Sequence, residues 1–327
     1  MTKIINLFYL TPNTTGGWVT YLSHLMKGFR EAGVQVNLYK VGNNTERKTR
    51  PFGYGEVYRN LCRDDALDKT MEHPTLIVAV GKKFAEVAED LIFAGAKLVV
   101  HDPTELKNLP AMGDGEDCVI IRKSGHKFLP GATFIPHPYQ RIKPNGEAVE
   151  HRRCVSISRI DFDKHTEILL DANRILKAED EEEIVIRGFE NRLYTRFKIC
   201  PHYPEWTQSV AAYPREHDAA FNILRGFDFM ADMSIIKGDG GGTQYTTLEA
   251  WDAGAIPIIQ ADWLQPDGEM VGDINCLSVE DAEHLALLLS GGLSPTAMDR
   301  MREEGLKSLK QHDAAMIAGQ YLDFMEG

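Results

Sequence analysis

The feature that most restricts the fold of this chain is an alternation of short apolar runs with helix-like stretches. Residues 4–10 (IINLFYL) form an apolar run that ends in a turn-rich loop, and residues 18–33 then carry apolar side chains at helical spacing. Residues 34–41 (VQVNLYKV) follow as a second strand-like run. Because a strand, a helix and a second strand in this order build a parallel sheet covered by helices, we predict an α/β fold.

The alternation stops at a polar linker, residues 141–150, and then starts again. Strand patterns precede the linker at residues 75–81, 97–102, 118–124 and 133–138. After it, strands are predicted at residues 152–160, 183–189, 233–238 and 255–262, and helices at residues 164–178, 217–230, 243–254 and from about 280 onward. A chain of 327 residues exceeds the size of most single cores. We therefore predict two α/β lobes, residues 1–142 and 143–305, with a C-terminal helix at 306–327 that crosses back to the first lobe.

The composition favours a globular, cytoplasmic protein. The formal net charge of −12 argues against a general basic coat for nucleic acid, although it leaves room for a local basic cleft. No apolar run approaches the roughly 18 residues that span a bilayer, and the N-terminal segment fits a first strand better than a signal peptide. The five cysteines are scattered, odd in number and form no CxxC pair, which indicates reduced thiols and no zinc site.

Two features of the first lobe follow predicted strands. Gly16 and Gly17 lie in the loop before the first helix, where they either contact a phosphate or acceptor or form a simple turn. A dinucleotide fingerprint needs three glycines in G-x-G-x-x-G, so a dehydrogenase is weakly supported. His101 ends a strand, at the sheet edge where ligands bind, and can hold a sugar hydroxyl or transfer a proton. A structural histidine fits the same position.

The second lobe opens with a basic loop, SISRIDFDK at residues 156–164. Arg159 and Lys164 follow a strand, and a guanidinium and an ammonium there can clamp a diphosphate. Surface ion pairing is the alternative role for these two residues. Asp161 and Asp163 form a D-x-D pair, but aspartates beside Arg and Lys in solvated loops are common, and we expect no metal.

A glycine-rich segment precedes a helix later in the second lobe, DGGGTQYTTLEAWDAGAIPIIQADW at residues 239–263. The stretch Gly240, Gly241, Gly242 can point backbone N–H groups at a phosphate, and the hydroxyl of Thr243 is a further donor. Glu249 follows within about two helical turns, where its carboxylate can accept hydrogen bonds from a diol such as a ribose. An exposed helix glutamate is the alternative.

Together these segments resemble the GT-B glycosyltransferases, and the resemblance extends over nearly the whole chain. It rests on the glycine-bearing first loop, the HD pair at His101, SRIDFDK and TTLEAWDAGAIPIIQAD. It implies two Rossmann-like lobes with a cleft between them, an N-terminal acceptor lobe and a C-terminal nucleotide-sugar lobe. It also implies that Arg159 and Lys164 bind the nucleotide diphosphate, that Glu249 binds the ribose, and that a UDP-sugar serves as co-substrate without a prosthetic group.

One position departs from the pattern of the retaining GT4 family. That family usually has another glutamate eight residues before the one that matches Glu249, and here that position is Gly241. Backbone N–H groups or Asp239 could take over its contact with the sugar. A narrower resemblance fits this departure, because YTTLEAWDAGAIP (245–257), the Arg-x4-Lys spacing and IRGFENR (186–192) are similar to segments of phage DNA α-glucosyltransferases.

The narrower resemblance implies a hydroxymethylated pyrimidine in duplex DNA as the acceptor, and the host cytoplasm as the place of action. Segments 43–63 and 122–128 mix basic and aromatic residues, which suits contact with a nucleic-acid backbone and stacking on its bases. A solvated loop with aromatic anchors is the alternative, and no membrane contact is expected. The DNA-binding candidates are Arg47, Lys48, Arg50, Tyr54, Arg122 and Lys123.

Three other functions stay open on the sequence. A GT4-like enzyme could act on a saccharide or small molecule. A non-catalytic protein could bind a sugar nucleotide with the same donor residues. Substitution of Arg159 would then lower the affinity for the sugar nucleotide, whereas in a catalyst it would lower turnover as well. A sugar epimerase shares the two-lobe plan but needs a pair of cleft carboxylates, which we do not identify.

Overall fold

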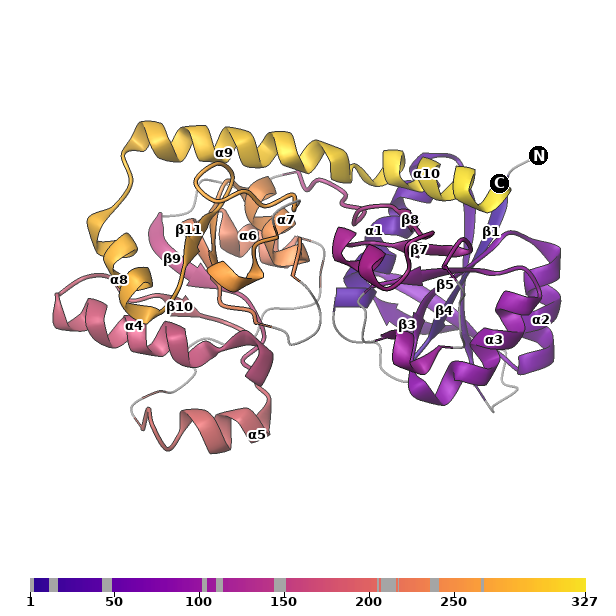
Figure 1. The fold of residues 1–327 in the computed structure, drawn as a ribbon, viewed down its shortest axis with the longest axis horizontal. Coiled ribbons are helices and arrows are strands. Elements are labelled where there is room, and N and C mark those ends of the chain that lie inside the picture. The colour runs from indigo at the N-terminus through magenta and orange to yellow at the C-terminus, as the bar shows by residue number, and fades with distance from the viewer. Residues whose placement is uncertain are drawn as a thin grey trace. The chain divides into compact units, whose positions relative to one another are not determined.

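The computed structural model describes most of the chain as two compact units (Figure 1). The described residues are 3–11, 17–42, 49–101, 105–109, 114–143, 151–204, 206, 216, 218–235, 241–265 and 268–327. Unit 1 contains the described residues up to Gln140 together with Gln311–Gly327. Unit 2 contains the described residues from Arg141 to Lys310.

The strands of unit 1 form a sheet in the order β3-β4-β2-β1-β5-β6-β7-β8. Neighbouring strands are parallel except β3 and β4, which pair as an antiparallel hairpin. Every residue of β5 is buried, as are all but the first of β1, because helices cover a parallel sheet on both faces. The strands are β1 Ile4–Leu10, β2 Gln35–Val41, β3 Thr49–Gly53, β4 Glu56–Leu61, β5 Thr75–Val80, β6 Lys97–Val100, β7 Cys118–Ile120 and β8 Thr133–Phe134.

The helices of unit 1 include the last one of the chain, α10, which packs against α1. A Cβ atom on Gly28 of α1 would lie 2.0 Å from the carbonyl oxygen of Ala314, so only a glycine allows this approach. The hydroxyl groups of Tyr21 and Tyr321 are hydrogen-bonded across the same contact. The helices are α1 Gly17–Glu31, α2 Arg63–Glu72, α3 Ala85–Phe93 and α10 Ala314–Glu326.

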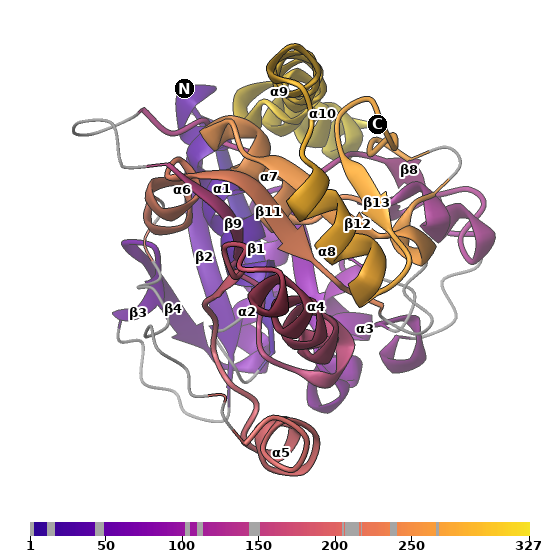
Figure 2. The ribbon, with the colours of Figure 1, turned by 90° about the vertical axis from the view of Figure 1, so that its left-hand side faces the viewer.

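Unit 2 contains a parallel sheet in the order β10-β9-β11-β12-β13. Figure 2 labels β9, β11, β12 and β13 of this sheet. Successive residues of β9 point to opposite faces: Cys154 joins the apolar cluster with α4 and α8, and Val155 joins the cluster with α6 and α7. The strands are β9 Arg152–Ser156, β10 Val185–Ile186, β11 Phe227–Asp232, β12 Ile256–Gln260 and β13 Leu277–Val279. The helices are α4 Thr166–Ala178, α5 Arg192–Tyr194 with a π-helical turn at Thr195–Ile199, α6 Ala219–Leu224, α7 Tyr245–Ala253, α8 Ala282–Gly291 and α9 Pro295–Leu309.

Two predicted elements of unit 2 are wrong. The predicted helix at 217–230 ends early, because α6 stops at Leu224 and β11 starts at Phe227. The predicted strand at 233–238 does not form over its described part, residues 233–235. Gly226 separates the two elements, and the run FDFMAD fills the sheet interior, so tertiary burial overrides the helical pattern.

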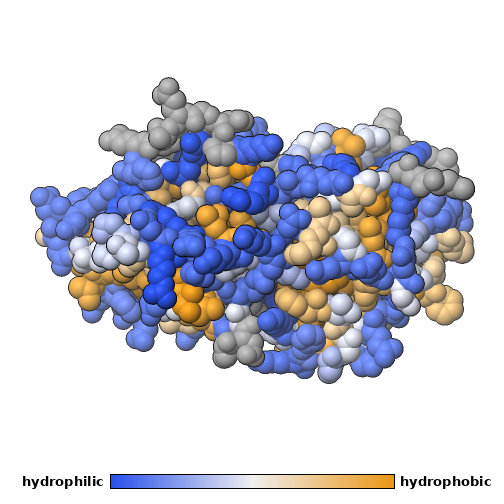
Figure 3. All heavy atoms as spheres, turned by 90° about the horizontal axis from the view of Figure 1, so that it is seen from above, coloured by the Kyte–Doolittle hydropathy of each residue, from blue (hydrophilic) through white to orange (hydrophobic). Residues whose placement is uncertain are grey.

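Most side chains on the face seen in Figure 3 are hydrophilic, with smaller apolar areas between them. Within the described ranges, no helix is both long and apolar enough to cross a membrane.

Candidate active site

A cluster of buried polar side chains surrounds the Lys164 ammonium in unit 2. Lys164 closes the turn after β9 and is only 8% exposed. Its Nζ atom donates to Ser234 Oγ at 2.5 Å and to Gln244 Oε1 at 2.7 Å, and it lies 3.4 Å from Asp232 Oδ2. Asp232 ends β11, the strand beside β9, so the two charges meet at the carboxyl-terminal edge of the sheet, where ligands of α/β sheets bind.

Asp232 is held in its ionised form. It is 3% exposed, and it accepts hydrogen bonds from the hydroxyl groups of Ser158 at 2.6 Å, Thr246 at 3.1 Å and Ser234. Burial alone raises the pKa of this carboxyl, but the Lys164 ammonium and the three hydroxyl donors outweigh burial, and the net pKa lies below its ordinary value. The cluster is therefore a buried ion pair with a full set of hydrogen bonds.

Arg159 lies on the same loop, but its side chain is 54% exposed. Its Nη1 atom donates to Asp161 Oδ2 at 3.0 Å. Asp161 Oδ1 in turn accepts from the backbone N–H of Phe162 at 2.7 Å and from Asn191 Nδ2 at 2.9 Å. Asp161 thus caps a turn and orients the guanidinium of Arg159.

The glycine-rich segment is described from Gly241 onward, and Asp239 and Gly240 lie outside the described residues. Gly241 and Gly242 have φ angles of 77° and 115°, in a region that favours glycine. A Cβ atom on Gly241 would lie 2.4 Å from the carbonyl oxygen of Trp263. This backbone leaves no room for a glutamate at position 241.

Side chains of unit 2 hold the segment against the residues that follow β12. Trp263 Nε1 donates to the carbonyl oxygen of Gly242 at 2.8 Å, and the buried hydroxyl of Thr243 donates to the Glu269 carboxylate. The first turn of α7 contains no acidic residue, and its N-terminal N–H groups carry a partial positive charge. The start of α7 and the Lys164 ammonium, which Gln244 contacts, therefore lie at one corner of unit 2, where Asp232 supplies the charge opposite to that of the lysine.

We expect Gly241→Ala to destabilise the protein by about 1–3 kcal/mol, because it strains the backbone and forces the added methyl against Trp263. The free energy of unfolding is measured by urea denaturation. Gly291→Ala, at a helical position where the added methyl meets open space, is the matched control and should be neutral or slightly stabilising. Equal effects of the two changes would contradict the tight packing of this turn.

Glu249 differs from the other acidic residues of α7 and the sheet edge, because no hydrogen bond or ion pair involves its carboxyl among the described residues. It is 8% exposed, and burial raises its pKa to about 8. It follows Thr246 by three residues and so lies on the helix face that Thr246 turns toward Asp232. By contrast, Asp252 of the same helix accepts hydrogen bonds from Arg141 and Ile142. A buried carboxyl without a protein partner is a candidate ligand contact.

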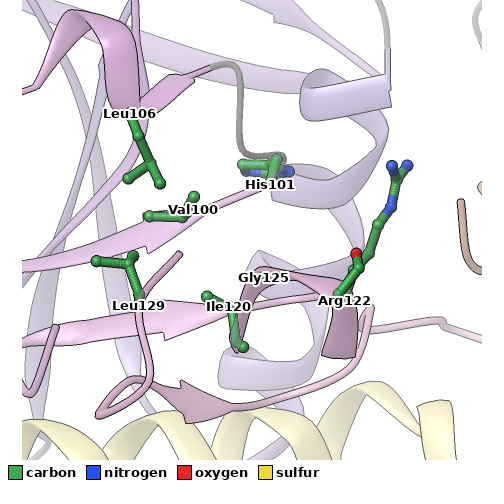
Figure 4. A pocket seen from close by; sticks show the side chains of 8 residues that line it. Val100, His101, Leu106, Ile120, Arg122, Gly125 and Leu129 are labelled. Atoms are coloured by element: carbon green, nitrogen blue, oxygen red, sulfur yellow. The ribbon is translucent and has the colours of Figure 1, made fainter. Parts of the chain in front are cut away.

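His101 follows β6 in unit 1 and is packed rather than open (Figure 4). It is buried, and its ring stacks edge-on against Tyr21 with centroids 4.6 Å apart. Its Nε2 atom lies 2.6 Å from the carbonyl oxygen of Val78, so this nitrogen is the donor. A role in holding a sugar therefore has to use the other ring nitrogen or a different side-chain position.

The other candidates of unit 1 are dispersed over several elements. His101 and Arg122 line one small, mainly apolar pocket, and the Arg122 side chain extends away from its apolar members in Figure 4. The Lys123 ammonium lies 5.7 Å from the centre of the Phe134 ring. Tyr54, in the β3–β4 turn, is hydrogen-bonded to Thr20 at 2.9 Å. Gly17 starts α1 and Arg50 lies on β3, whereas Gly16, Arg47 and Lys48 lie outside the described residues.

Sequence reasoning did not find the other members of the polar cluster around Lys164 and Asp232. They belong to three segments that the chain alone gives no reason to combine. The sequence offers one signal for these residues, a short polar residue at or just after the end of a buried strand. Such residues come together because the carboxyl ends of neighbouring parallel strands lie at the same edge of the sheet. The missed residues are Ser158, Asp232, Ser234, Gln244 and Thr246.

In the part of the chain that the structure describes, no three His, Cys, Asp or Glu side chains come together in a way that could hold a metal ion. The charge balance of the Lys164 cluster comes from protein groups instead.

Comparison with known proteins identifies the fold. No protein-family model matches the chain, and no curated protein sequence matches it. Among solved structures, an alpha-glucosyltransferase in complex with UDP-glucose and DNA containing an abasic site is similar, with a TM-score of 0.71, 13% identity and 100% of both chains covered. Anabaena HepE in complex with UDP-glucose has a TM-score of 0.67, 11% identity and 99% of both chains covered. The pneumococcal O-GlcNAc transferase GtfA in complex with UDP and GlcNAc has a TM-score of 0.66, 11% identity and 99% of both chains covered.

These neighbours are glycosyltransferases of the GT-B class, and this chain has their fold. The prediction of an α/β chain with two Rossmann-like lobes is confirmed, since each unit contains a largely parallel sheet.

Proposed function

We propose that this protein is a retaining glycosyltransferase that moves a sugar from a UDP-sugar to an acceptor hydroxyl. The observation that carries the proposal is the corner of unit 2 where Lys164 contacts Gln244, the residue before α7, and where α7 itself carries the buried carboxyl of Glu249, which has no partner among the described residues. A nucleotide sugar has the matching groups, a diphosphate and a ribose diol. The solved structures with this fold that contain UDP or UDP-glucose support the same ligand.

In the proposed reaction, the protein stabilises the leaving group. The Lys164 ammonium, the Arg159 guanidinium and N–H groups of the glycine segment hold the diphosphate as the bond between its oxygen and the sugar C1 atom breaks. The acceptor oxygen forms the new bond to C1 from the same face, and its proton passes to the departing phosphate. Neither a metal ion nor a covalent carboxylate intermediate is needed, and His101 orients the sugar.

For the acceptor, we propose a hydroxymethylated pyrimidine in duplex DNA. Such a base must leave the stack before its hydroxyl can react, which costs a few kcal/mol and requires a firm hold on the strand. Arg50, Tyr54, Arg122 and Lys123 of unit 1 are the described side chains proposed for that role, together with Arg47 and Lys48. Two similar solved structures contain alpha-glucosyltransferase with UDP and a 13-mer DNA that includes an HMU base.

A saccharide or small-molecule acceptor is the second candidate. The fold is shared with HepE and with the O-GlcNAc transferase GtfA, which are not described with DNA. In either case the donor site keeps the same roles, and a UDP-sugar donor favours a cytoplasmic location for the enzyme.

The test incubates the protein with radiolabelled UDP-glucose and matched duplexes that contain cytosine, hydroxymethylcytosine or hydroxymethyluracil. Label in a hydroxymethylated duplex alone supports both the reaction and the acceptor, and NMR of the product should show the anomeric configuration of the donor. Slow release of UDP without labelled DNA would refute the DNA acceptor and keep the donor site. Absence of both UDP release and UDP binding would refute the proposed donor site.

A further inference from the structure

An exposed patch of apolar and basic side chains lies on residues 189–198 of unit 2, which include α5 and most of the π-helical turn after it. Neither the donor site nor the unit 1 candidates use this segment. Its apolar members are unusually open for large side chains, with Phe189 46%, Leu193 61% and Phe197 61% exposed. Its basic members Arg192, Arg196 and Lys198 are exposed as well. We call these six residues the α5 patch. In Figures 1 and 2, α5 stands out from the body of unit 2 below α4.

The inner side of this segment is firmly held, so the outer side chains project from a defined support. Asn191 Oδ1 accepts from the backbone N–H groups of Leu193 and Tyr194, which caps the first turn. Tyr194 is buried, packs edge-on against Phe162 and donates to the Glu167 carboxylate. The exposed side chains are therefore not the result of a loose loop.

The exposed side chains are distributed over three successive pieces of backbone. Phe189 precedes the helix, Arg192 and Leu193 lie on α5, and Arg196, Phe197 and Lys198 lie on the π-helical turn Thr195–Ile199. The Arg196 guanidinium lies 5.4 Å from the centre of the Phe197 ring, so a basic and an apolar member of the patch are in contact.

The charge of the patch is opposite to that of the protein. Residues 187–198 contain four basic residues and one acidic residue, a net charge of +3, in a chain whose net charge is −12. A local positive surface on an acidic protein favours binding of a polyanion. Exposed aromatic and leucine side chains favour a polyanion that also has flat apolar surfaces. Nucleic acid has both features: phosphates for Arg and Lys, and base faces for Phe and Leu.

We propose that the α5 patch is a second DNA-binding surface, on the donor unit, in which Arg192, Arg196 and Lys198 contact phosphates while Phe197 and Leu193 press against base steps. This inference rests on the proposed DNA acceptor. Wedging apolar side chains between bases unstacks them, which lowers the energy needed to expose the base that reacts.

The patch is joined to the donor site by hydrogen bonds within unit 2. Asn191, which caps the patch, donates to Asp161, and Asp161 holds the guanidinium of Arg159. The backbone also closes tightly here, because a Cβ atom on Gly188 would lie 2.0 Å from the carbonyl oxygen of Ser158. DNA seated on the patch therefore contacts a segment that shares its support with the donor loop.

The experiment measures binding of an unmodified duplex by fluorescence anisotropy over a range of salt concentrations. Arg192→Ala/Arg196→Ala/Lys198→Ala should weaken DNA binding about tenfold or more. It should also make the plot of log binding constant against log salt concentration less steep, by about one unit of slope for each phosphate that is no longer neutralised. Leu193→Ala/Phe197→Ala should weaken binding with little change in slope. Arg300→Ala/Lys310→Ala, which removes exposed cations of α9 and its end, is the matched control and should bind as the unchanged protein does.

UDP affinity and UDP-glucose hydrolysis are measured on the same variants and should be unchanged. A fluorophore on the exposed Cys200, next to the patch, should change its emission when DNA binds. If the unchanged protein binds and labels DNA but the patch variants bind it equally well, the inference is wrong and the proposed function stands. If the unchanged protein binds no DNA, or binds only anionic lipid vesicles through the patch, the inference and the DNA acceptor are both wrong, while UDP hydrolysis still tests the donor site.

Discussion

Lys164→Met should destabilise the protein by about 3–5 kcal/mol, because it leaves the Asp232 carboxylate buried without its counter-charge. It should also lower the rate of sugar transfer by about 10²–10³-fold, since the leaving diphosphate no longer meets a positive charge at this position. Urea denaturation measures the first effect, and release of UDP from UDP-glucose measures the second.

The double variant Lys164→Met/Asp232→Asn separates these two roles of the lysine. Removing both charges abolishes the unpaired carboxylate, so most of the stability should return while the rate stays low. Lys177→Met, at an exposed position of α4, is the matched control and should change neither quantity. Recovery of activity in the double variant would show that Lys164 serves only to neutralise Asp232.

Glu249→Gln should stabilise the protein in a pH-dependent way. Burial raises the pKa of Glu249 from 4.5 to about 8, so the folded state binds the proton more tightly than the unfolded state does. The unchanged protein therefore loses stability as the pH rises from 4.5 to about 8, and the glutamine variant, which does not ionise, avoids this loss. The difference between the two proteins should grow to about 3–5 kcal/mol at pH 8 and vanish near pH 4.5.

The same variant should bind UDP about 10–100-fold more weakly, because a ribose diol can no longer donate its hydrogen bonds to a charged acceptor. In the unchanged protein, UDP affinity should rise as the pH approaches 8, because the carboxylate form accepts both hydroxyl groups. Isothermal titration at several pH values measures this rise, and the variant should show none of it. Glu283→Gln, on the exposed side of α8, is the control. A pH-independent stability difference for Glu249→Gln would contradict the burial of this carboxyl.

Much of the fold follows from local patterns in the sequence. Residues 4–10 are predicted as a strand and form β1, and the predicted helix at 243–254 corresponds to α7, Tyr245–Ala253. Gly254 ends α7 in the left-handed conformation, with φ of 81°, which is why a glycine separates the helix from β12. These features depend on residues close together in the chain.

The secondary-structure elements that the sequence analysis predicted wrongly or missed depend on contacts between distant parts of the chain. The segment at 217–230 has helical periodicity as far as Leu224, but Phe227, Phe229 and Met230 belong to a strand between β9 and β12. The hairpin β3–β4, residues 49–61, is missed because its strands contain glycine, proline and arginine, which are typical of an edge.

The sequence by itself determined the α/β class and the two lobes, and it singled out Arg159, Lys164 and Glu249 as candidates for the donor site. Only the tertiary structure decided the surroundings of these side chains. Lys164 meets Asp232 and Gln244, which are 68 and 80 residues away in the chain, and Glu249 becomes a buried carboxyl without a partner among the described residues. The physical reason is that propensity and periodicity act between neighbours along the chain, whereas burial and ion pairing depend on which strand ends the folded sheet brings together.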